Sequence, residues 1–324
     1  MINKLKYWNR IFSTYFFQKK SNLSFWHGKP TINSNSSFSH IDQYYMLFDY
    51  KADYKGEYDA NGIPMLNYHG DIGLQYNPIA IAQWGLGNYN IWKNNKSRER
   101  YDNFMLVANW LVENLEENKF GIFVWNHKFN WPYKEKLNNP WYSGLAQGQG
   151  LSVLVRAFKE TKDEKYINSA RKVYASFLKE TNYGGVTSTD TNNNIWIEEY
   201  IISEPTHILN GFIWALWGIY DYWLLTNDNS VKKLFDKYII TIIQNINNYD
   251  IGYWSLYELS GLKIKMRTSI FYHRLHIVQL KILFNMTNIE KFNKVSIKWS
   301  GYLESKVNIY RSTIMKVIFK LMYY

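Results

Sequence analysis

Hydrophobic segments recur in pairs of contrasting character over most of this chain. In each pair the first segment is apolar nearly all round and contains Gly and Ala, whereas the second is amphipathic with Lys and Glu. An inner helix buried on both sides, followed by an outer helix facing water, gives this contrast. About four such pairs predict a mostly α fold, an α/α toroid or incomplete α/α barrel whose inner helices surround a cavity. A stack of helical repeats is the competing architecture, although the sequence has no strict period.

Local signals mark where the expected helices begin and end. Asn77 and Pro78 are a typical N-cap and first helical residue, so a helix is predicted from there to about residue 89, and Ser97 opens the next one. The later pairs are expected at residues 142–159 and 163–179, 205–225 and 230–249, and 271–284 and 289–302. Five glycines are expected to let the inner helices approach closely: Gly144, Gly148, Gly150, Gly211 and Gly218.

The segments outside these helices differ in character. The loop from residue 118 to residue 140 is long and rich in aromatic rings, which is typical of a packed lid or of the rim of a binding site. Residues 1–76 are punctuated by Gly and Asn and predict an irregular or small β segment. We expect an N-terminal extension of residues 1–76 packing on the barrel, a toroid domain of residues 77–305 and a basic C-terminal tail of residues 306–324.

The net charge of +11 favours an anionic partner. The sequence has no compact Lys/Arg stripe and no nucleic-acid-binding module, so nucleic acid is not the expected partner. An acidic polysaccharide or an anionic membrane surface fits the charge equally well. Both ends of the chain are basic and aromatic, which leaves peripheral membrane contact open beside a solvated face. A homodimer is a further open alternative.

The absence of cysteine bears on the compartment. It excludes disulfides and thiolate sites, and it fits a reducing environment. The first twenty residues lack the apolar stretch and cleavage site of a signal peptide. Residues 209–225 approach a membrane span, but they are short and interrupted by polar residues and glycines, which favours a buried helix. We therefore expect a cytoplasmic protein, with peripheral attachment to the inner face of the membrane as the alternative.

Aromatic residues make up 19% of the chain, with 28 Tyr, 18 Phe and 14 Trp. Part of this content must form the core, since aromatic rings dominate core burial. The rest has two explanations that composition does not separate. One is a general compositional bias, and the other is a carbohydrate groove whose rings lie against sugars while the phenol hydroxyls make hydrogen bonds.

Four stretches, taken together, resemble the glucuronyl C5-epimerases. They are residues 75–86 (QYNPIAIAQWGL), 141–149 (WYSGLAQGQ), 198–200 (EEY) with 208–212 (ILNGF), and 272–280 (YHRLHIVQL). The C-terminal domain of this family is an α/α barrel, so the resemblance implies that residues 77–305 are a catalytic domain of that type. Long animal members carry a β-sandwich after the first stretch; that module, with any ion it binds, is not expected here.

The resemblance implies an isomerase that works without a cofactor. It would convert D-glucuronic to L-iduronic acid residues in the biosynthesis of a polysaccharide or lipid-linked oligosaccharide, for example a heparan sulfate-like glycan. Such an enzyme removes the proton on C5, α to the carboxylate, and returns one to the opposite face. By resemblance, Tyr200 and Tyr272 are the catalytic tyrosines and Glu199 is the catalytic carboxylate. If Glu199 is buried, it is expected to be protonated and able to donate a proton.

A tyrosine base needs nearby cations or hydrogen-bond donors, because an unperturbed Tyr titrates near pH 10. His273, Arg274 and His276 lie within one helical turn of Tyr272 and are expected to supply this help. The two histidines also have a spacing that suits a metal, but no third ligand is suggested nearby and no metal site is predicted. The remaining predicted substrate-binding residues are Asn210, Tyr257, Tyr76, Tyr142 and Gln147.

The chain departs from the family at one position. Ser260 stands where the family has an Arg that contacts the acidic substrate, and Arg267 and Arg274 are the candidates to replace it. Other interpretations stay open. A polysaccharide lyase uses the same C5 carbanion, and a non-catalytic glycan-binding protein would keep the groove without turnover. A hydrolase is disfavoured because no second acidic residue stands out to pair with Glu199 as acid and nucleophile. Glu198 and Glu199 would also fit a solvated pair before a turn.

Overall fold

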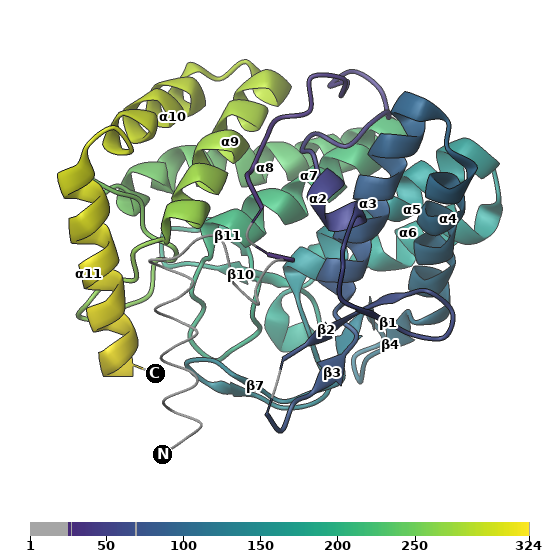
Figure 1. The fold of residues 1–324 in the computed structure, drawn as a ribbon, viewed down its shortest axis with the longest axis horizontal. Helices are drawn as coiled ribbons and strands as arrows, with labels where there is room; N and C mark the ends of the chain where they lie inside the picture. Colours follow the sequence, from purple (N-terminus) through teal and green to yellow (C-terminus); the bar gives the residue numbers. More distant parts are fainter. Residues whose placement is uncertain (1–24, 27, 69, 324) are drawn as a thin grey trace.

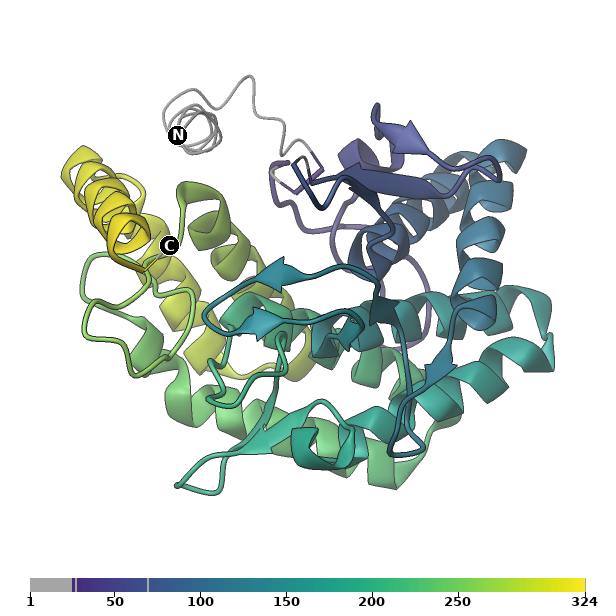
Figure 2. The same cartoon turned by 90° about the horizontal axis from the view of Figure 1, so that it is seen from below.

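The computed structural model describes residues 25–26, 28–68 and 70–323. The basic residues of the first twenty positions lie outside this part of the chain. Four antiparallel helical hairpins form most of the fold: α3 (Pro78–Asn95) with α4 (Arg98–Glu113), α5 (Gly144–Thr161) with α6 (Glu164–Tyr174), α7 (Leu209–Thr226) with α8 (Asn229–Asn245), and α9 (Ile270–Thr287) with α10 (Glu290–Tyr302). The hairpins follow one another round an arc, from α3 and α4 at one end to α9 and α10 at the other (Figures 1 and 2). This arrangement confirms the predicted α/α toroid.

The inner and outer helices differ in burial as the sequence predicts. In α5 every residue from position 144 to position 157 is buried, and in α7 the same holds from position 209 to position 222. In α6 only one face is buried, formed by Tyr166, Ile167, Ser169, Ala170 and Val173. A helix that is apolar all round is stable only when both sides are covered, whereas an amphipathic helix needs one covered face.

Each inner helix ends at a residue with a left-handed backbone conformation, which turns the chain into the outer helix. These residues have φ values between 53° and 60° and are Lys96, Lys162, Asn227 and Asn288. The predicted caps Asn77 and Ser97 both accept hydrogen bonds from the first turn of their helices. Helix α3 runs to Asn95, beyond the predicted end near residue 89, because Trp92 packs on Tyr101 of α4, with ring centroids 4.8 Å apart.

Helices α5 and α7 approach each other closely at two glycines. A Cβ on Gly148 would lie 2.2 Å from the Cα of Ala215, and a Cβ on Gly218 would lie 2.1 Å from the carbonyl oxygen of Gly148. Real Cβ atoms do not come this close to backbone atoms, so both positions require glycine. This contact bears out the expected role of these two glycines.

Residues 28–68 share the core of the helices. They contain α2 (Asp49–Ala52) and the strands β1 (Glu57–Tyr58) and β2 (Pro64–Asn67), which form an antiparallel three-stranded sheet with β3 (Leu74–Gln75). Tyr45 links this segment to the inner helices, because its hydroxyl donates to Asp221 of α7 at 2.6 Å. Asp221 also pairs with Arg156 of α5 at 2.6 Å, and both side chains are fully buried.

The aromatic loop between α4 and α5 folds into short strand pairs. These strands are β4 (Glu116–Glu117), β5 (Phe123–Val124), β6 (Asn126–His127), β7 (Trp131–Pro132), β8 (Lys136–Leu137) and β9 (Trp141–Tyr142). They pair as β4 with β5, β6 with β9, and β7 with β8, all antiparallel. Phe129, Leu137 and Trp141 form a buried cluster that holds the loop together, whereas Phe120 is 47% exposed.

The remaining elements connect or extend the hairpins. They are β10 (Thr187–Thr189) and β11 (Ile195–Ile197), which pair antiparallel, the 3₁₀ turns Ala175–Leu178, Thr181–Tyr183 and Ile246–Tyr249, and helix α11 (Lys306–Tyr323). Helix α11 occupies the expected basic tail and lies at the edge of the arc (Figure 1). Its buried residues Ser312, Lys316 and Phe319 are spaced along one face. Among the described helices, none is long and apolar enough to cross a membrane.

Candidate active site

Glu198 and Glu199 follow strand β11, and their carboxylates have different environments. Glu198 accepts hydrogen bonds from Ser188 at 2.6 Å and from the backbone amide of His207 at 3.2 Å, and its carboxylate lies 2.7 Å from Nδ1 of His207. Glu198 is therefore a structural residue that fixes the chain before α7. Both carboxylates are buried, with exposed fractions of 1% and 5%, so the interpretation of a solvated pair is wrong.

Glu199 lies against the first turn of α7. A Cβ on Gly211 would lie 2.2 Å from its Oε2, which has no hydrogen-bond partner among the described residues. Burial raises the pKa of Glu199 to about 8, with a further rise from Glu258, although the nearby phenol of Tyr200 opposes the rise. At neutral pH Glu199 is therefore mainly protonated, and it can act as a proton donor.

Tyr257 stands at the centre of the aromatic cluster around this carboxyl group. Its ring meets Tyr272 edge-on, with centroids 5.1 Å apart and an interplanar angle of 76°. Burial raises the pKa of Tyr257 well above its ordinary value, and Glu199, Tyr272, Tyr200 and Tyr133 each add to the rise. Tyr133, Tyr200 and Tyr272 all pack against the hydrophobic cluster that contains Tyr257. The two tyrosines predicted as catalytic, from distant parts of the sequence, thus lie at the same cluster.

Tyr133 and Lys134 bring the aromatic loop to the same place. The ring of Tyr133 lies 4.4 Å from that of Tyr200, and its hydroxyl donates to Glu258 at 2.7 Å. Lys134 forms an ion pair with the other oxygen of Glu258, which is fully buried. The loop is therefore a packed wall of the site, and Glu258 holds it through two partners.

The histidines of α9 are buried and neutral. Both rings contact Ser255, with Nδ1 of His273 at 2.7 Å and Nδ1 of His276 at 3.2 Å from its Oγ. His273 also contacts the Trp299 carbonyl through Nε2 at 3.0 Å and stacks on Trp254 at 3.9 Å. Burial lowers the pKa of His273 to about 4 and the pKa of His276 well below its ordinary range. The expectation of cationic help from these rings is corrected, since neither is protonated at neutral pH.

The two arginines considered for the position of the missing family residue have different surroundings. Arg274 is exposed on α9. The guanidinium of Arg267 donates to the hydroxyl of Tyr253 at 3.1 Å and to the carbonyl of Lys265 at 2.9 Å. Ser260 itself has a buried hydroxyl with no hydrogen-bond partner among the described residues.

Of the other predicted binding residues, Asn210 and Gln147 are both buried, but their side-chain amides differ in hydrogen bonding. Asn210 precedes Gly211 in α7, is 2% exposed, and has no partner for its side-chain oxygen within the described chain. Gln147 donates to Phe123 and Ser176 and accepts from the amide of Trp125 at 3.1 Å. Because Gln147 is fully buried and both ends of its amide are used, its expected contact with substrate is corrected to a structural role in holding the loop.

The two remaining predicted tyrosines are Tyr142 and Tyr76. Tyr142 is half-buried in β9, and burial raises the pKa of its phenol. Tyr76 is 37% exposed, donates to Asp59 at 2.7 Å and packs on Trp110 of α4. Their roles in substrate binding stay predictions.

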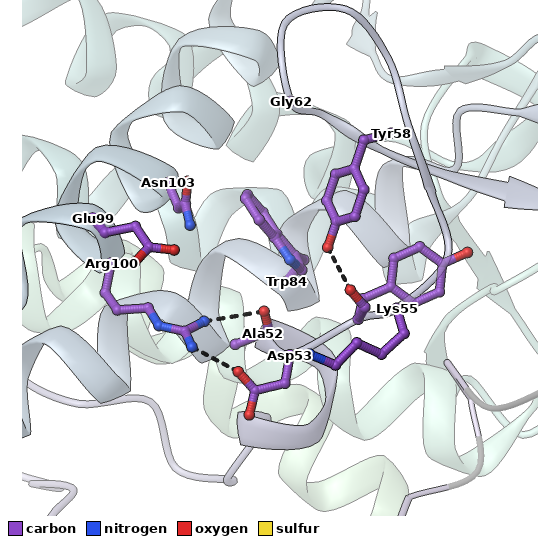
Figure 3. A pocket seen from close by; sticks show the side chains of 10 residues that line it. Ala52, Asp53, Lys55, Tyr58, Gly62, Trp84, Glu99, Arg100 and Asn103 are labelled. Carbon is purple, nitrogen blue, oxygen red and sulfur yellow. Dashed lines mark hydrogen bonds and ion pairs between the residues drawn. The ribbon is translucent and has the colours of Figure 1, made fainter.

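A concavity of about 350 Å³ opens between α2, the β1–β2 hairpin and helices α3 and α4. Figure 3 shows Arg100 at its edge, donating to the carbonyl of Ala52 at 3.1 Å and to Asp53 at 2.6 Å, while Tyr58 donates to Tyr54. The charge of Arg100 is thus already neutralised. None of the predicted site residues is among the described residues that line this concavity, so it is separate from the tyrosine cluster.

Sequence reasoning missed four residues of the cluster: Tyr133, Lys134, Glu258 and Lys316. Glu258 directly follows Tyr257, and this adjacency was the available signal for it. Tyr133 and Lys134 lie in the aromatic loop, where ring content pointed to a lid or rim but to no particular residue. Lys316 had no local signal, because its contacts are with residues about fifty positions earlier in the chain.

Comparisons with known proteins show the family of this chain. Residues 117–301 match the model of the D-glucuronyl C5-epimerase C-terminus. The D-glucuronyl C5-epimerase of Caenorhabditis elegans is 32% identical over 225 residues, which are 64% of this chain and 36% of that enzyme. An uncharacterized protein of Methanocaldococcus jannaschii is 29% identical over 218 residues, or 64% of this chain and 69% of that protein. This chain thus spans about a third of the worm enzyme and about two thirds of the archaeal protein.

A solved structure supports the fold separately from these sequence matches. The cellobiose 2-epimerase of Spirochaeta thermophila superposes with a TM-score of 0.50 at 11% identity, over 69% of this chain and 57% of that one. At this identity the likeness shows a shared toroid and nothing of the substrate. The family match covers more than half of the chain, and the chain belongs to the D-glucuronyl C5-epimerase family.

Proposed function

We propose that the protein is a uronic acid C5-epimerase that acts on glucuronic acid residues of a polysaccharide or lipid-linked oligosaccharide. The observation that carries the proposal is the environment of Tyr257, which has Glu199, Tyr200 and Tyr272 as its electrostatic neighbours. The name of the worm relative suggests the substrate, a D-glucuronyl residue. The product would be the L-iduronyl residue, which differs only in the configuration at C5.

The proposed reaction needs two proton transfers on opposite faces of the sugar. One phenolate takes the C5 proton, and the electron pair of the broken C–H bond moves into the adjacent carboxylate. A group on the other face then gives a proton to C5, and the carboxylate returns to its resting charge. Tyr200 and Tyr272 are the proposed partners in these transfers, since each lies beside Tyr257 but comes from a different part of the fold.

Glu199 is proposed to serve as the proton store of the site. Its raised pKa of about 8 keeps the proton on the carboxyl group at neutral pH. In the proposed cycle, a proton passes between Glu199 and the nearby phenol of Tyr200. Groups whose pKa lies near the working pH give the most efficient acid–base catalysis.

The substrate is proposed to be an acidic glycan, as the net charge of +11 favours an anionic partner. Asn210 supports a sugar-binding role because its buried side-chain oxygen lacks a protein partner among the described residues and lies next in sequence to Gly211, which contacts Glu199. A sugar hydroxyl that donates to this oxygen would satisfy it.

The test is proton exchange at C5. The full chain would be incubated in deuterated water with an oligosaccharide of alternating glucuronic acid and N-acetylglucosamine, and the product would be analysed by NMR. We expect deuterium at C5 together with resonances of iduronic acid. A shortened chain with an unsaturated, ultraviolet-absorbing end would instead identify a lyase. Binding of the oligosaccharide without any exchange would identify a non-catalytic glycan-binding protein and overturn the proposal.

A further inference from the structure

Helix α11 exposes a stripe of large apolar side chains along its outer face. Five of them are between 56% and 73% exposed: Val307, Tyr310, Ile314, Leu321 and Met322. The first four are spaced by three, four and seven positions, which places them on one face of the helix. The opposite face is buried and reaches the tyrosine cluster through Phe319.

The outer helices of the four hairpins have surfaces of another kind. Among their described residues, α8 exposes one large hydrophobic side chain, Ile240, and α10 exposes one, Ile297, whereas α4 and α6 expose none. The other exposed positions of these helices are mostly charged or polar, as is usual for a helix that faces water. A contiguous exposed apolar stripe instead marks a surface for interaction. The outer face of α11 is therefore a docking surface.

The charges of this helix are all of one sign. Residues 305–324 include four basic residues and no acidic one, and the nearest acidic residue in the sequence, Glu304, precedes the helix. Lys306 and Arg311 are exposed. Arg311 lies within the apolar stripe, with its guanidinium carbon 4.0 Å from the ring centroid of Tyr253. Cations that border an apolar stripe are complementary to the phosphates of anionic lipids.

The loop of residues 261–267 adds positive charge beside the end of α11. The backbone amide of Ile264 donates to the hydroxyl of Tyr323 at 3.3 Å, so the loop lies against the last turn of the helix. Lys263 and Lys265, on either side of Ile264, are both exposed. Each basic residue near an anionic membrane surface adds to the attraction.

We propose that the outer face of α11 binds the surface of a membrane that contains anionic lipids, with the helix lying in the plane of the interface. A second copy of this chain fits the face less well, because two α11 helices would bring the same cations together without an acidic partner. The inner face of the helix contacts the tyrosine cluster, so docking would hold that cluster roughly one helix diameter, about 10 to 12 Å, from the headgroups. Among the proposed substrates, this position favours a lipid-linked oligosaccharide.

Co-sedimentation of the full chain with lipid vesicles tests the proposal. Wild type should bind vesicles of phosphatidylcholine and phosphatidylglycerol, and bind vesicles of phosphatidylcholine alone much more weakly. Ile314→Asp should lower the affinity for the anionic vesicles by about 10- to 100-fold, because it removes an apolar contact and adds a like charge. Lys306→Gln should lower it by about fivefold. Ile240→Asp is the matched control, since it makes the same change at a 51% exposed isoleucine of α8, and it should bind as wild type does.

Three results would overturn the proposal. They are a wild type that does not bind anionic vesicles, an affinity that does not depend on the anionic lipid, and an Ile314→Asp variant that binds as tightly as wild type. Sedimentation velocity without lipid identifies the alternative occupant: a wild-type dimer that Ile314→Asp dissociates, with no vesicle binding, would make this face an interface between copies.

Activity on a soluble oligosaccharide keeps this proposal separate from the proposed function. Ile314 lies on the face of α11 opposite the tyrosine cluster, so Ile314→Asp should retain wild-type Tm and wild-type C5 exchange on the oligosaccharide of glucuronic acid and N-acetylglucosamine. Vesicle binding without C5 exchange in wild type would support the docking surface and overturn the epimerase proposal. C5 exchange without vesicle binding would do the reverse.

Discussion

Gly211 and Glu199 touch at a distance that leaves no room for a side chain. A Cβ on Gly211 would lie 2.2 Å from Oε2 of Glu199 and 3.0 Å from its Cβ and carboxyl carbon. The first turn of α7 thus limits where the carboxyl group can lie, and Asn210 belongs to the same turn.

Replacing Gly211 with Ala should reduce activity while the fold survives. The added methyl group must push Glu199 away, and a displacement of about 1 Å in a catalytic group can lower the rate by about 100-fold. Measuring kcat for C5 exchange, together with Tm, tests this. Gly301→Ala is the matched control, because that glycine is also helical and a Cβ there meets nothing within 4 Å. Normal kcat in Gly211→Ala would mean that the position of Glu199 is not critical.

Glu199→Gln should be more stable than wild type, by an amount that grows with pH. The folded pKa of about 8 lies above the ordinary value of 4.5, so the folded state binds more protons between these values. Stability of wild type is therefore lost as pH rises from about 4.5 to 8, and Gln, which does not titrate, escapes the loss. We expect a difference of roughly 3 to 5 kcal/mol in the free energy of unfolding at pH 8.

Urea unfolding at pH 5 and pH 8 measures this difference. Glu204→Gln, at an exposed carboxyl group, is the control for the substitution itself. Equal stability of Glu199→Gln and wild type at both pH values would show that the carboxyl group is not buried in solution. The kcat for C5 exchange is a second measurement on Glu199→Gln. It should fall, because the Gln side chain cannot donate a proton as the carboxyl group does.

Tyr200→Phe and Tyr272→Phe should each lower kcat by about 10²- to 10⁴-fold. If the two phenols act on opposite faces of the sugar, each variant should lower the rate of C5 proton exchange more for one epimer of the substrate than for the other. NMR exchange rates measured separately on glucuronyl and iduronyl oligosaccharides would assign the faces. Tyr183→Phe, at a phenol that is 65% exposed, is the control. Equal losses from both epimers in both variants would argue against a two-sided mechanism.

Much of the fold could be predicted because its signals are local. Asn77 and Ser97 cap helices through bonds to residues two and three positions away, and the apolar inner helices show in composition. The end of α3 was missed because a ring contact between helices, Trp92 on Tyr101, extends it. Propensity in the polar segment after residue 89 gave no sign of that contact.

The site was less predictable because its electrostatics depend on tertiary contacts. The triad of Glu199, Tyr200 and Tyr272 was proposed from a family resemblance, and residue types alone would not have separated it from other carboxylates and phenols. Burial decides that His273 is neutral and Gln147 structural, and neither fact shows in the sequence. Lys316 reaches the cluster only because α11 folds back on the loop that holds Arg267.

Asp221→Asn should be strongly destabilising, because the buried pair of Asp221 and Arg156 joins α7 to α5 and, through Tyr45, to the N-terminal segment. Removing one charge leaves the other buried without a counter-charge, so we expect a loss of about 3 to 5 kcal/mol in the free energy of unfolding. Tyr45→Phe removes one hydrogen bond and should cost about 1 to 3 kcal/mol.

Urea unfolding of two further variants separates the charge effect from loss of packing. Asp236→Asn breaks the pair with Lys232 on the outer helix α8, where both side chains are at least a third exposed, and should change stability by less than about 1 kcal/mol. Arg156→Met combined with Asp221→Leu removes both charges, so it should lose less stability than Asp221→Asn alone. If the double variant is less stable than Asp221→Asn, the attraction between the two charges contributes more to stability than the cost of leaving Arg156 buried without a counter-charge.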